Sequence, residues 1–141
     1  MTRETDALVD HYLLEWDSRG WANAYHSLIE LGPQILAGLS RRFTASHDSA
    51  FRAALVELAH QVHSSDALPL FDRALQDESQ EVWKEALDGL VALASLPSIL
   101  LLEVALRRPP PGRTSEAEWR SWIREALQQA RAQYEARGGV A

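Results

Sequence analysis

Histidine and carboxylate side chains are the groups in this chain that could do chemistry, because cysteine is absent. His60 and His63 are three residues apart and Glu57 precedes His60 by three, so one helix could present all of them on one face. His11 and Glu15 form a second pair at helical spacing. A catalytic zinc ion needs three protein ligands in tetrahedral geometry. Solvated polar residues near a helix end are the simpler interpretation, so we expect neither a metal nor another cofactor.

Covalent catalysis and phosphate binding lack their usual motifs. The sequence has no Gly-x-Ser-x-Gly elbow and no cysteine nucleophile. Its seven glycines are scattered and form no phosphate-binding loop. Carboxylates are plentiful, yet nothing in the sequence gives two of them divergent environments. We therefore expect a protein that is not an enzyme.

Charge is distributed unevenly along the chain. Residues 1–106 contain 7 Lys and Arg against 16 Asp and Glu, whereas residues 107–141 contain 7 Arg against 4 Glu. An acidic body repels nucleic-acid backbones and attracts basic partners. A local basic patch near the C-terminal end would still suit an anionic ligand, so nucleic acid remains an alternative. The arginines that could form this patch are Arg41, Arg42, Arg107, Arg108, Arg113, Arg120 and Arg124.

The elements that must position these side chains are helices that repeat along the chain. In one pattern, an aromatic residue is followed by small, large and large apolar residues at +3, +4 and +7; in the other, large apolar residues occur at 0, +3 and +7. Both recur in steps of 30 to 32 residues, which indicates stacked helical hairpins. The first pattern begins at Trp21, Phe51 and Trp83, and the second at Leu36, Leu68 and Ile99.

Helix start and stop signals predict the boundaries. Gly32-Pro33 separates the helices of the first hairpin, and Thr2 or Thr5 could cap the first helix. Ser115 and Glu118 have the spacing of a capping box. The predicted elements of this single domain, residues 1–141, are an N-terminal cap helix over 4–17, hairpins over 21–44, 50–77 and 81–107, and a C-terminal cap helix over 115–137.

The second helix of the third hairpin is apolar nearly all round between residues 99 and 106. Such a helix should be covered on both faces, and the C-terminal cap helix is the element left to cover it. Trp83 is expected between stacked repeats. No stretch alternates as a strand does, so we predict an all-α fold.

The segment DALPLFDRALQDESQEVWKEALDGL, residues 66–90, resembles bacterial HEAT-like repeats, and the resemblance covers about residues 20–107. It implies a right-handed α-α superhelix (a solenoid) whose stacked faces bind other macromolecules. Trp83 stands where the family pattern has arginine, so the family's Asp–Arg ladder is expected to be missing at this junction. The matching positions are Ala67 to Leu70, Ala74, Leu75, Asp77, Glu81, Val82, Ala86, Gly89 and Leu90.

Carboxylates of the second and third hairpins are the binding candidates that we favour. In the second helices, the position four residues after the first apolar anchor carries Ser40, Asp72 and Glu103. Two carboxylates on that row argue against phosphate contact and favour a basic protein partner. The predicted docking residues, on the inner face and the adjoining turn ridge, are Asp72, Asp77, Glu78, Glu81 and Glu103.

These observations predict a non-catalytic protein-binding module, either an adaptor or an inhibitor of the immunity-protein type, that docks a basic partner on its acidic face. The alternative is a HEAT-like enzyme or binder that acts on nucleic acid or a chromophore through the Arg-rich C-terminal patch. The N-terminus lacks a signal-peptide pattern, and the most apolar segment, residues 90–106, is interrupted by Ser95, Pro97, Ser98 and Glu103. We expect a cytoplasmic monomer or weak dimer that does not span a membrane.

Overall fold

The computed structural model describes residues 3–16 and 20–139, and within these ranges every regular element is a helix. The all-α prediction is therefore confirmed. The helices are α1 (Arg3–Leu13), α2 (Trp21–Glu30), the 3-10 helix η1 (Gly32–Ile35), α3 (Leu36–Ala45), α4 (Ser49–Val62), the 3-10 helix η2 (Ser65–Ala67), α5 (Leu68–Leu75), α6 (Gln80–Leu93), α7 (Leu96–Arg107) and α8 (Glu116–Ala136).

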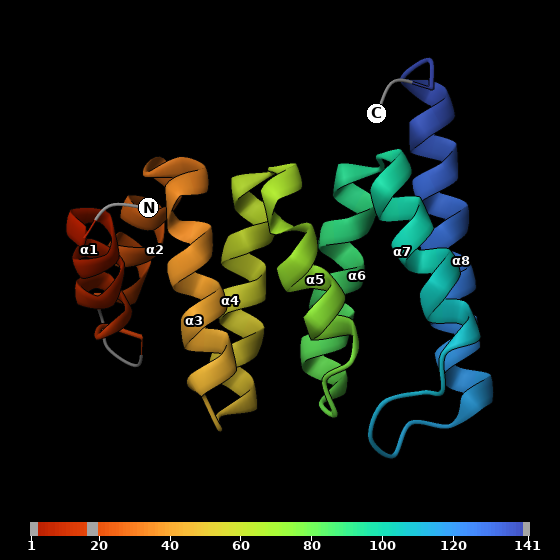
Figure 1. Ribbon diagram of the computed structural model, residues 1–141, viewed down its shortest axis with the longest axis horizontal. Helices are drawn as coiled ribbons and strands as arrows, with labels where there is room; N and C mark the ends of the chain where they lie inside the picture. Colours follow the sequence, from red (N-terminus) through yellow and green to blue (C-terminus); the bar gives the residue numbers. More distant parts are fainter. Residues whose placement is uncertain (1–2, 17–19, 140–141) are drawn as a thin grey trace.

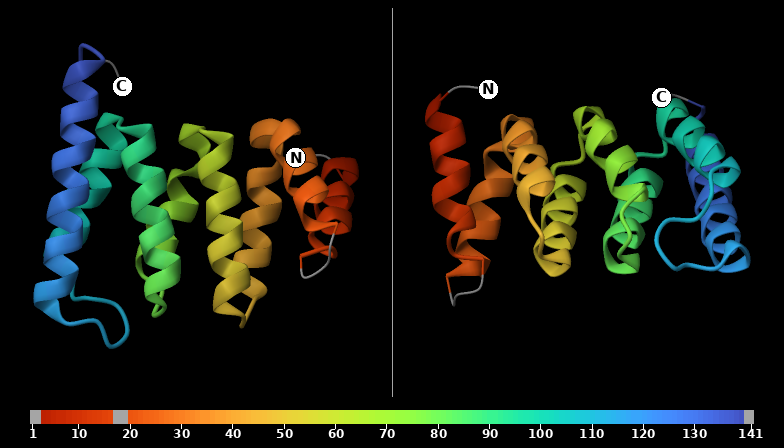
Figure 2. Two further views of the ribbon diagram at one scale, coloured as in Figure 1. Left: turned by 180° about the vertical axis from the view of Figure 1, so that it is seen from behind. Right: turned by 60° about the horizontal axis from the view of Figure 1, so that its bottom comes forward.

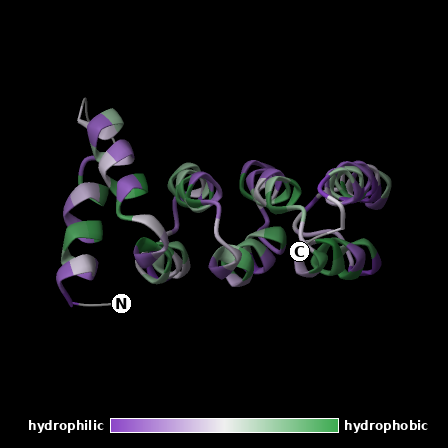
Figure 3. Ribbon diagram, turned by 90° about the horizontal axis from the view of Figure 1, so that it is seen from above, coloured by the Kyte–Doolittle hydropathy of each residue, from purple (hydrophilic) through white to green (hydrophobic). Residues whose placement is uncertain are grey.

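The helices lie in two layers along the long axis of the molecule (Figures 1 and 2). Seen from above, α3, α5 and α7 form one layer and α4, α6 and α8 form the other (Figure 3). The α1–α2 pair is tilted at the N-terminal end, where α1 packs on α3 and α2 packs on α4. Each helix thus buries one face against the opposite layer and its sides against its neighbours, which a single hairpin could not do.

Local signals explain where the helices begin and end. Gly32 adopts φ +71°, a conformation that favours glycine, and Pro33 follows in the first turn of η1. The Asp48 carboxylate accepts the backbone N–H groups of Ala50 and Phe51 and so caps α4. Ser115 caps α8 by accepting the N–H of Glu118 at 3.1 Å.

Two of the predicted cap details differ from the structure. The Glu118 carboxylate accepts a hydrogen bond from Gln80 Nε2 at 3.3 Å and so ties α8 to α6. This contact takes the place of the second hydrogen bond of the expected capping box, in which Glu118 would accept the backbone N–H of Ser115. Thr5 was a candidate N-cap of the first helix, but it lies inside α1 and is buried. Thr2 lies outside the described residues. Helix α1 ends at Leu13, before the predicted end at residue 17, which also lies outside the described residues.

The core runs along the molecule between the two layers. Trp83 of α6 is fully buried, and its ring meets that of Trp119 of α8 edge-on at a centroid distance of 5.1 Å. Phe71 of α5 is buried against Gly89 of α6, where a methyl group in place of the glycine hydrogen would lie 2.4 Å from the ring. Trp83 is expected between stacked repeats, and the structure places its ring at the contact between α6 and the C-terminal helix α8.

Helix α7 is covered less completely than its composition predicts. Helix α8 packs against both α6 and α7, as expected for the C-terminal helix. Three large apolar side chains of α7 nevertheless remain about half exposed, namely Leu96 (47%), Leu100 (57%) and Val104 (45%). The prediction that both faces of α7 are covered is wrong for its outer face. Helix α8 lies beside α7 in the other layer and leaves the outer side of α7 open.

None of the helices in residues 3–16 and 20–139 has both the length and the apolar character that a membrane crossing requires.

Candidate functional site

The candidate metal ligands do not converge. Helix α4 ends at Val62, and His63 lies past that end with φ +53°, so His60 and His63 do not share a helix face. Helix α1 ends at Leu13, so Glu15 lies beyond the helix that carries His11. Within the described parts of the chain, no three His, Cys, Asp or Glu side chains are grouped as metal ligands would be.

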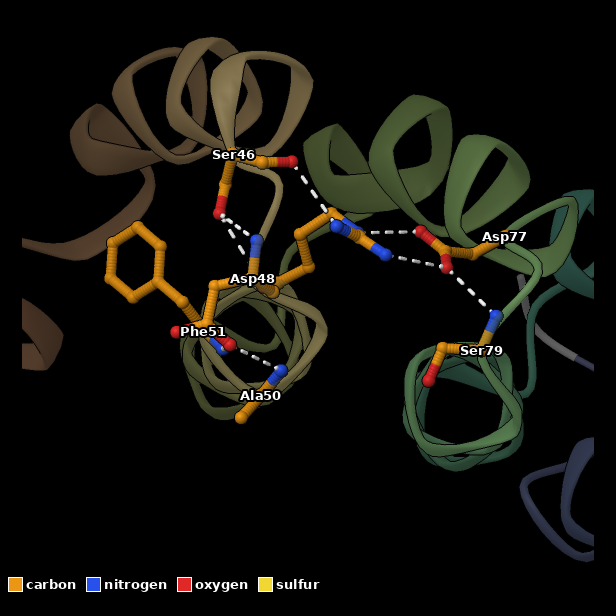
Figure 4. A network of polar contacts seen from close by, with 7 residues as sticks. Ser46, Asp48, Ala50, Phe51, Asp77 and Ser79 are labelled. Atoms are coloured by element: carbon orange, nitrogen blue, oxygen red, sulfur yellow. Dashed lines mark hydrogen bonds and ion pairs between the residues drawn. The ribbon is translucent and has the colours of Figure 1, made fainter.

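Asp77 is part of the framework and not of an open docking surface. Its carboxylate accepts two hydrogen bonds from Arg52 of α4, at 2.9 Å and 3.1 Å, and one from the backbone N–H of Ser79 at 3.0 Å. Arg52 also donates to the carbonyl of Ser46 at 3.1 Å, and Figure 4 shows the two turns that this network joins. The side chains of Asp77 and Arg52 are only 9% and 12% exposed. The predicted docking role of Asp77 is therefore corrected.

The same pair is an Asp–Arg contact at this junction, although it does not use the position that the resemblance assigns to arginine. Trp83 occupies the position where the family pattern has arginine, and it does turn into the core. However, Asp77 pairs with Arg52, an arginine at the other end of the same hairpin (residues 50–77) and next to the aromatic anchor Phe51. The sequence comparison missed this pair because the arginine is displaced by one residue from the expected position.

Asp72 and Glu103 are neutralised by arginines of this chain. Asp72 of α5 accepts a hydrogen bond from Arg108 at 3.0 Å, and Glu103 of α7 accepts one from Arg131 of α8 at 2.7 Å. All four side chains are partly solvated, so each pair has a modest energy but still cancels the charge that a basic partner would meet. The inner face predicted to be acidic is close to neutral at these positions.

Glu78 and Glu81 are exposed, and within the described residues neither forms an ion pair. Glu78 lies in the turn before α6, against the loop that contains Gly112. Glu81 lies in the first turn of α6, where the helix dipole favours a carboxylate. Of the five predicted docking residues, only these two retain an uncompensated charge.

Carboxylates that form no ion pair within residues 3–16 and 20–139 gather on the outer side of the α4–α6 layer. Glu81, Glu85 and Asp88 are spaced at i, i+4 and i+7 and so share one face of α6. Glu57 of α4 lies close enough for its charge to act on Glu85. We call Glu57, Glu81, Glu85 and Asp88 the acidic face.

The acidic face carries electrostatic repulsion. Burial, followed by the charges of Glu57, Asp88 and Glu81, raises the pKa of Glu85 to about 7. Burial also raises the pKa of Asp88, an effect that the nearby charge of His60 opposes. An isolated carboxylate in a nonpolar setting or beside like charges loses part of its ionised form in this way. The free protein would therefore gain from a cation placed here.

Aromatic and basic side chains border the acidic face. Tyr25 of α2 donates a hydrogen bond to Glu57 at 3.4 Å, and burial and the Glu57 charge raise the pKa of Tyr25 to about 12. Lys84 is the cation next to Glu85 in sequence, but its Nζ lies 4.4 Å from the ring centre of Trp122. The lysine is thus held on the α8 side of the face by a cation–π contact.

Part of the acidic face could have been found from the sequence. The Glu81, Glu85 and Asp88 row is a helical i, i+4, i+7 pattern, and only Glu81 was included in the prediction. No sequence signal placed Glu57 beside it, because that approach depends on how α4 packs against α6.

The predicted basic patch is divided among several places. Arg41 and Arg42 of α3 pair with Asp6 and Asp10 of α1. Arg108 pairs with Asp72, and Arg120 pairs with Glu116 within α8. In the described structure, Arg107, Arg113 and Arg124 form no ion pair. Arg107 and Arg124 lie together with Arg131 along a groove between α7 and α8.

Comparisons with protein-family models, with curated proteins and with solved structures gave no match to this chain.

Proposed function

We propose that this protein is a non-catalytic protein-binding module that docks a basic partner segment on the acidic face formed by Glu57, Glu81, Glu85 and Asp88. The carrying observation is the clustering of four carboxylates from two helices, with Glu81, Glu85 and Asp88 in one row on α6 and Glu57 of α4 near Glu85. Burial of Glu85, together with the charges of its three neighbours, raises the pKa of Glu85 to about 7. A lysine- or arginine-rich segment would remove this repulsion on binding. The electrostatic gain then appears in the complex and not in the free protein.

The proposed class of function, protein binding, is the one that the charge distribution predicts. The proposed docking surface is different: it is the acidic face, in place of the predicted inner face. Asp72, Asp77 and Glu103 are held by arginines, so a partner would have to displace an internal ion pair to use them. Glu81 belongs to both the predicted and the proposed surface, and Glu78 lies exposed in the turn just before it.

A HEAT-like superhelix is the architecture that we propose for this module. The repeated patterns at steps of 30 to 32 residues, the two layers of helices and the Arg52–Asp77 pair between successive turns support it. An adaptor or an immunity-type inhibitor fits the size of the chain and its net charge of −6. A cytoplasmic monomer or weak dimer is part of the same proposal.

The test compares three baits in affinity capture from native lysate with quantitative mass spectrometry. The first is the wild-type chain, and the second carries Glu81→Gln, Glu85→Gln and Asp88→Asn. The matched control removes three acidic charges elsewhere with Glu4→Gln, Glu30→Gln and Glu116→Gln, all at exposed positions. We expect a basic protein that is retained by the wild type and the control, is released by salt, and is depleted at least about tenfold on the acidic-face variant.

Equal recovery of that protein on the acidic-face variant would refute the assignment of the face. Stoichiometric recovery of nucleic acid, or turnover of a bound small molecule, would refute the non-catalytic protein-binding function and favour the alternative. The groove that contains Arg107, Arg124 and Arg131 is the observation that favours an anionic ligand for that alternative.

A further inference from the structure

The outer side of α7 carries an aliphatic stripe, which we define as Leu96, Leu100 and Val104. These residues are spaced at i, i+4 and i+8, so they lie on one face of the helix over about 12 Å. The fully buried side of α7, with Leu102 and Ala105, points the opposite way. Half of the six exposed large apolar side chains in the described residues belong to this stripe. Such clustering differs from the isolated apolar residues that are normal on a surface.

A groove runs beside the stripe between α7 and α8. Leu106 and Leu127 contribute apolar lining, and Arg107, Arg124 and Arg131 contribute positive charge. Arg131 is paired with Glu103, and the groove also contains Glu135. Arg107 and Arg124, which form no ion pair within the described residues, give this basic groove a net positive charge on a chain whose net charge is −6.

We propose that the aliphatic stripe and the basic groove together dock an amphipathic helix of a partner protein, with aliphatic side chains on the stripe and carboxylates beside Arg107 and Arg124. Charge complementarity selects an acidic ligand. A surface whose apolar contacts repeat at i, i+4 and i+8 matches the periodicity of a helix that lies along it. The stripe lies in the layer opposite the acidic face, and the basic groove lies between α7 and α8 at the end of the molecule beyond α6, so this second partner can bind together with the basic partner.

The composition of the stripe decides between this partner and the other anionic or apolar ligands. Single-stranded nucleic acid is bound largely through bases stacked on aromatic side chains, whereas neither the stripe nor the lining of the basic groove contains an aromatic residue. A symmetric contact with a second copy would bring two basic grooves into one interface and so cost electrostatic repulsion. An acidic, aliphatic helix meets neither difficulty.

The experiment uses the full chain and a fluorescent acidic peptide of about 18 residues, long enough to form a helix over the stripe, with Leu at helical spacing and Glu on both flanks. A second peptide with Lys in place of every Glu tests the sign of the charge. Binding is followed by fluorescence anisotropy, and the variants are Leu100→Glu and the pair Arg107→Ala with Arg124→Ala. Leu8→Glu, which changes an exposed leucine at the other end of the molecule, is the matched control.

We expect saturable binding of the acidic peptide at a Kd of roughly 100 µM or tighter. We also expect a loss of at least about tenfold for both α7 variants, and wild-type affinity for Leu8→Glu. The variant with a neutralised acidic face should also bind this peptide normally, which separates a failure here from a failure of the proposed function. Circular dichroism melts of each variant confirm that the fold is kept.

Four results would overturn this proposal. They are no saturable binding of the acidic peptide, equal affinity for the Lys-containing peptide, tighter binding of single-stranded RNA or of phosphatidylserine vesicles than of the acidic peptide, and a wild-type dimer in sedimentation that Leu100→Glu disperses.

Discussion

The guanidinium of Arg52 and the carboxylate of Asp77 form a two-pronged ion pair that joins two inter-hairpin turns, with N–O distances of 2.9 Å and 3.1 Å. The arginine also holds the turn before α4 through the Ser46 carbonyl, and the aspartate holds the turn before α6 through the Ser79 N–H. Both side chains are nearly buried, so the pair supports the backbone of the stack as well as satisfying two charges.

Removal of Arg52 should destabilise the fold strongly. The Arg52→Ala variant leaves Asp77 nearly buried without its counter-charge, and breaking a buried pair in this way costs ~3–5 kcal/mol. The free energy of unfolding from urea titration measures this. Arg41→Ala is the control, since Arg41 is an exposed arginine that pairs with Asp6 and Asp10, and it should have a much smaller effect. Similar losses for the two variants would show that the Arg52–Asp77 pair has no special structural role.

Trp83 should be much more sensitive to truncation than Trp122, the exposed aromatic residue at the α6–α8 contact. Trp83→Ala removes a fully buried ring that meets Trp119, and large-to-small changes of this kind cost ~3–5 kcal/mol. Trp83→Phe should cost less, because it keeps an aromatic ring and removes an indole N–H that has no hydrogen-bond partner among the described residues. Urea denaturation followed by circular dichroism compares both. Trp122→Ala, at a residue 39% exposed, should be the mildest; a loss as large as that of Trp83→Ala would contradict the packing.

Glu85 should make stability depend on pH near neutrality. Its pKa is about 7 in the folded protein against an ordinary value of 4.5, so the folded state binds more protons between these values. The free energy of unfolding therefore falls as pH rises from about 4.5 to about 7, and the loss is absent below this window and complete above it. Glu57, Glu81 and Asp88 face Glu85 and contribute to the repulsion.

Glu85→Gln removes this proton-linked loss. The variant should be more stable than the wild type at pH 8 and equal to it at pH 4, as measured by urea titration at pH 4, 6 and 8. Glu30→Gln, at an exposed position in α2, controls for the change in net charge. A difference between Glu85→Gln and the wild type that stays constant across the three pH values would refute the linkage.

Gly89 should be intolerant of a side chain although it lies inside a helix. A methyl group at this position would lie 2.4 Å from the Phe71 ring, and the buried ring has little room to move. Overpacking costs ~1–3 kcal/mol, which exceeds or matches the ~1 kcal/mol that alanine gains over glycine in a helix. We expect Gly89→Ala to lower the midpoint of thermal unfolding. Gly38→Ala, whose methyl group would lie 3.0 Å from Val9 Cγ1, should be better tolerated; the reverse order would contradict the packing of α5 on α6.

The helices could be predicted from local signals, and the arrangement of charges could not. The hairpin predicted over 81–107 corresponds to α6 and α7, which span Gln80 to Arg107, and the helix predicted over 115–137 corresponds to α8, Glu116–Ala136. Apolar spacing, Gly-Pro breaks and serine caps act within a few residues, so they can be read from one stretch of chain. The HEAT-like superhelix remains a prediction.

The candidate site, unlike the helices, could not be predicted from local signals in the sequence. Asp72, Asp77 and Glu103 stand in the sequence as free acids, yet their arginine partners are 36, 25 and 28 residues away. Glu85 sits on a helix row that the sequence displays, but its raised pKa depends first on its burial and then on the approach of Glu57 from α4, and packing sets both.

By itself, the sequence determined that this protein is all-α, the approximate bounds of most of its helices, and that its charge is predominantly acidic. Only the tertiary structure decided which acids are neutralised, which are crowded together, and which side of α7 stays open. The physical reason is that the two kinds of interaction join residues at different separations along the chain. Helix formation and capping depend on neighbours in the chain, whereas ion pairing and desolvation depend on separations of a few ångströms between helices, which packing alone sets.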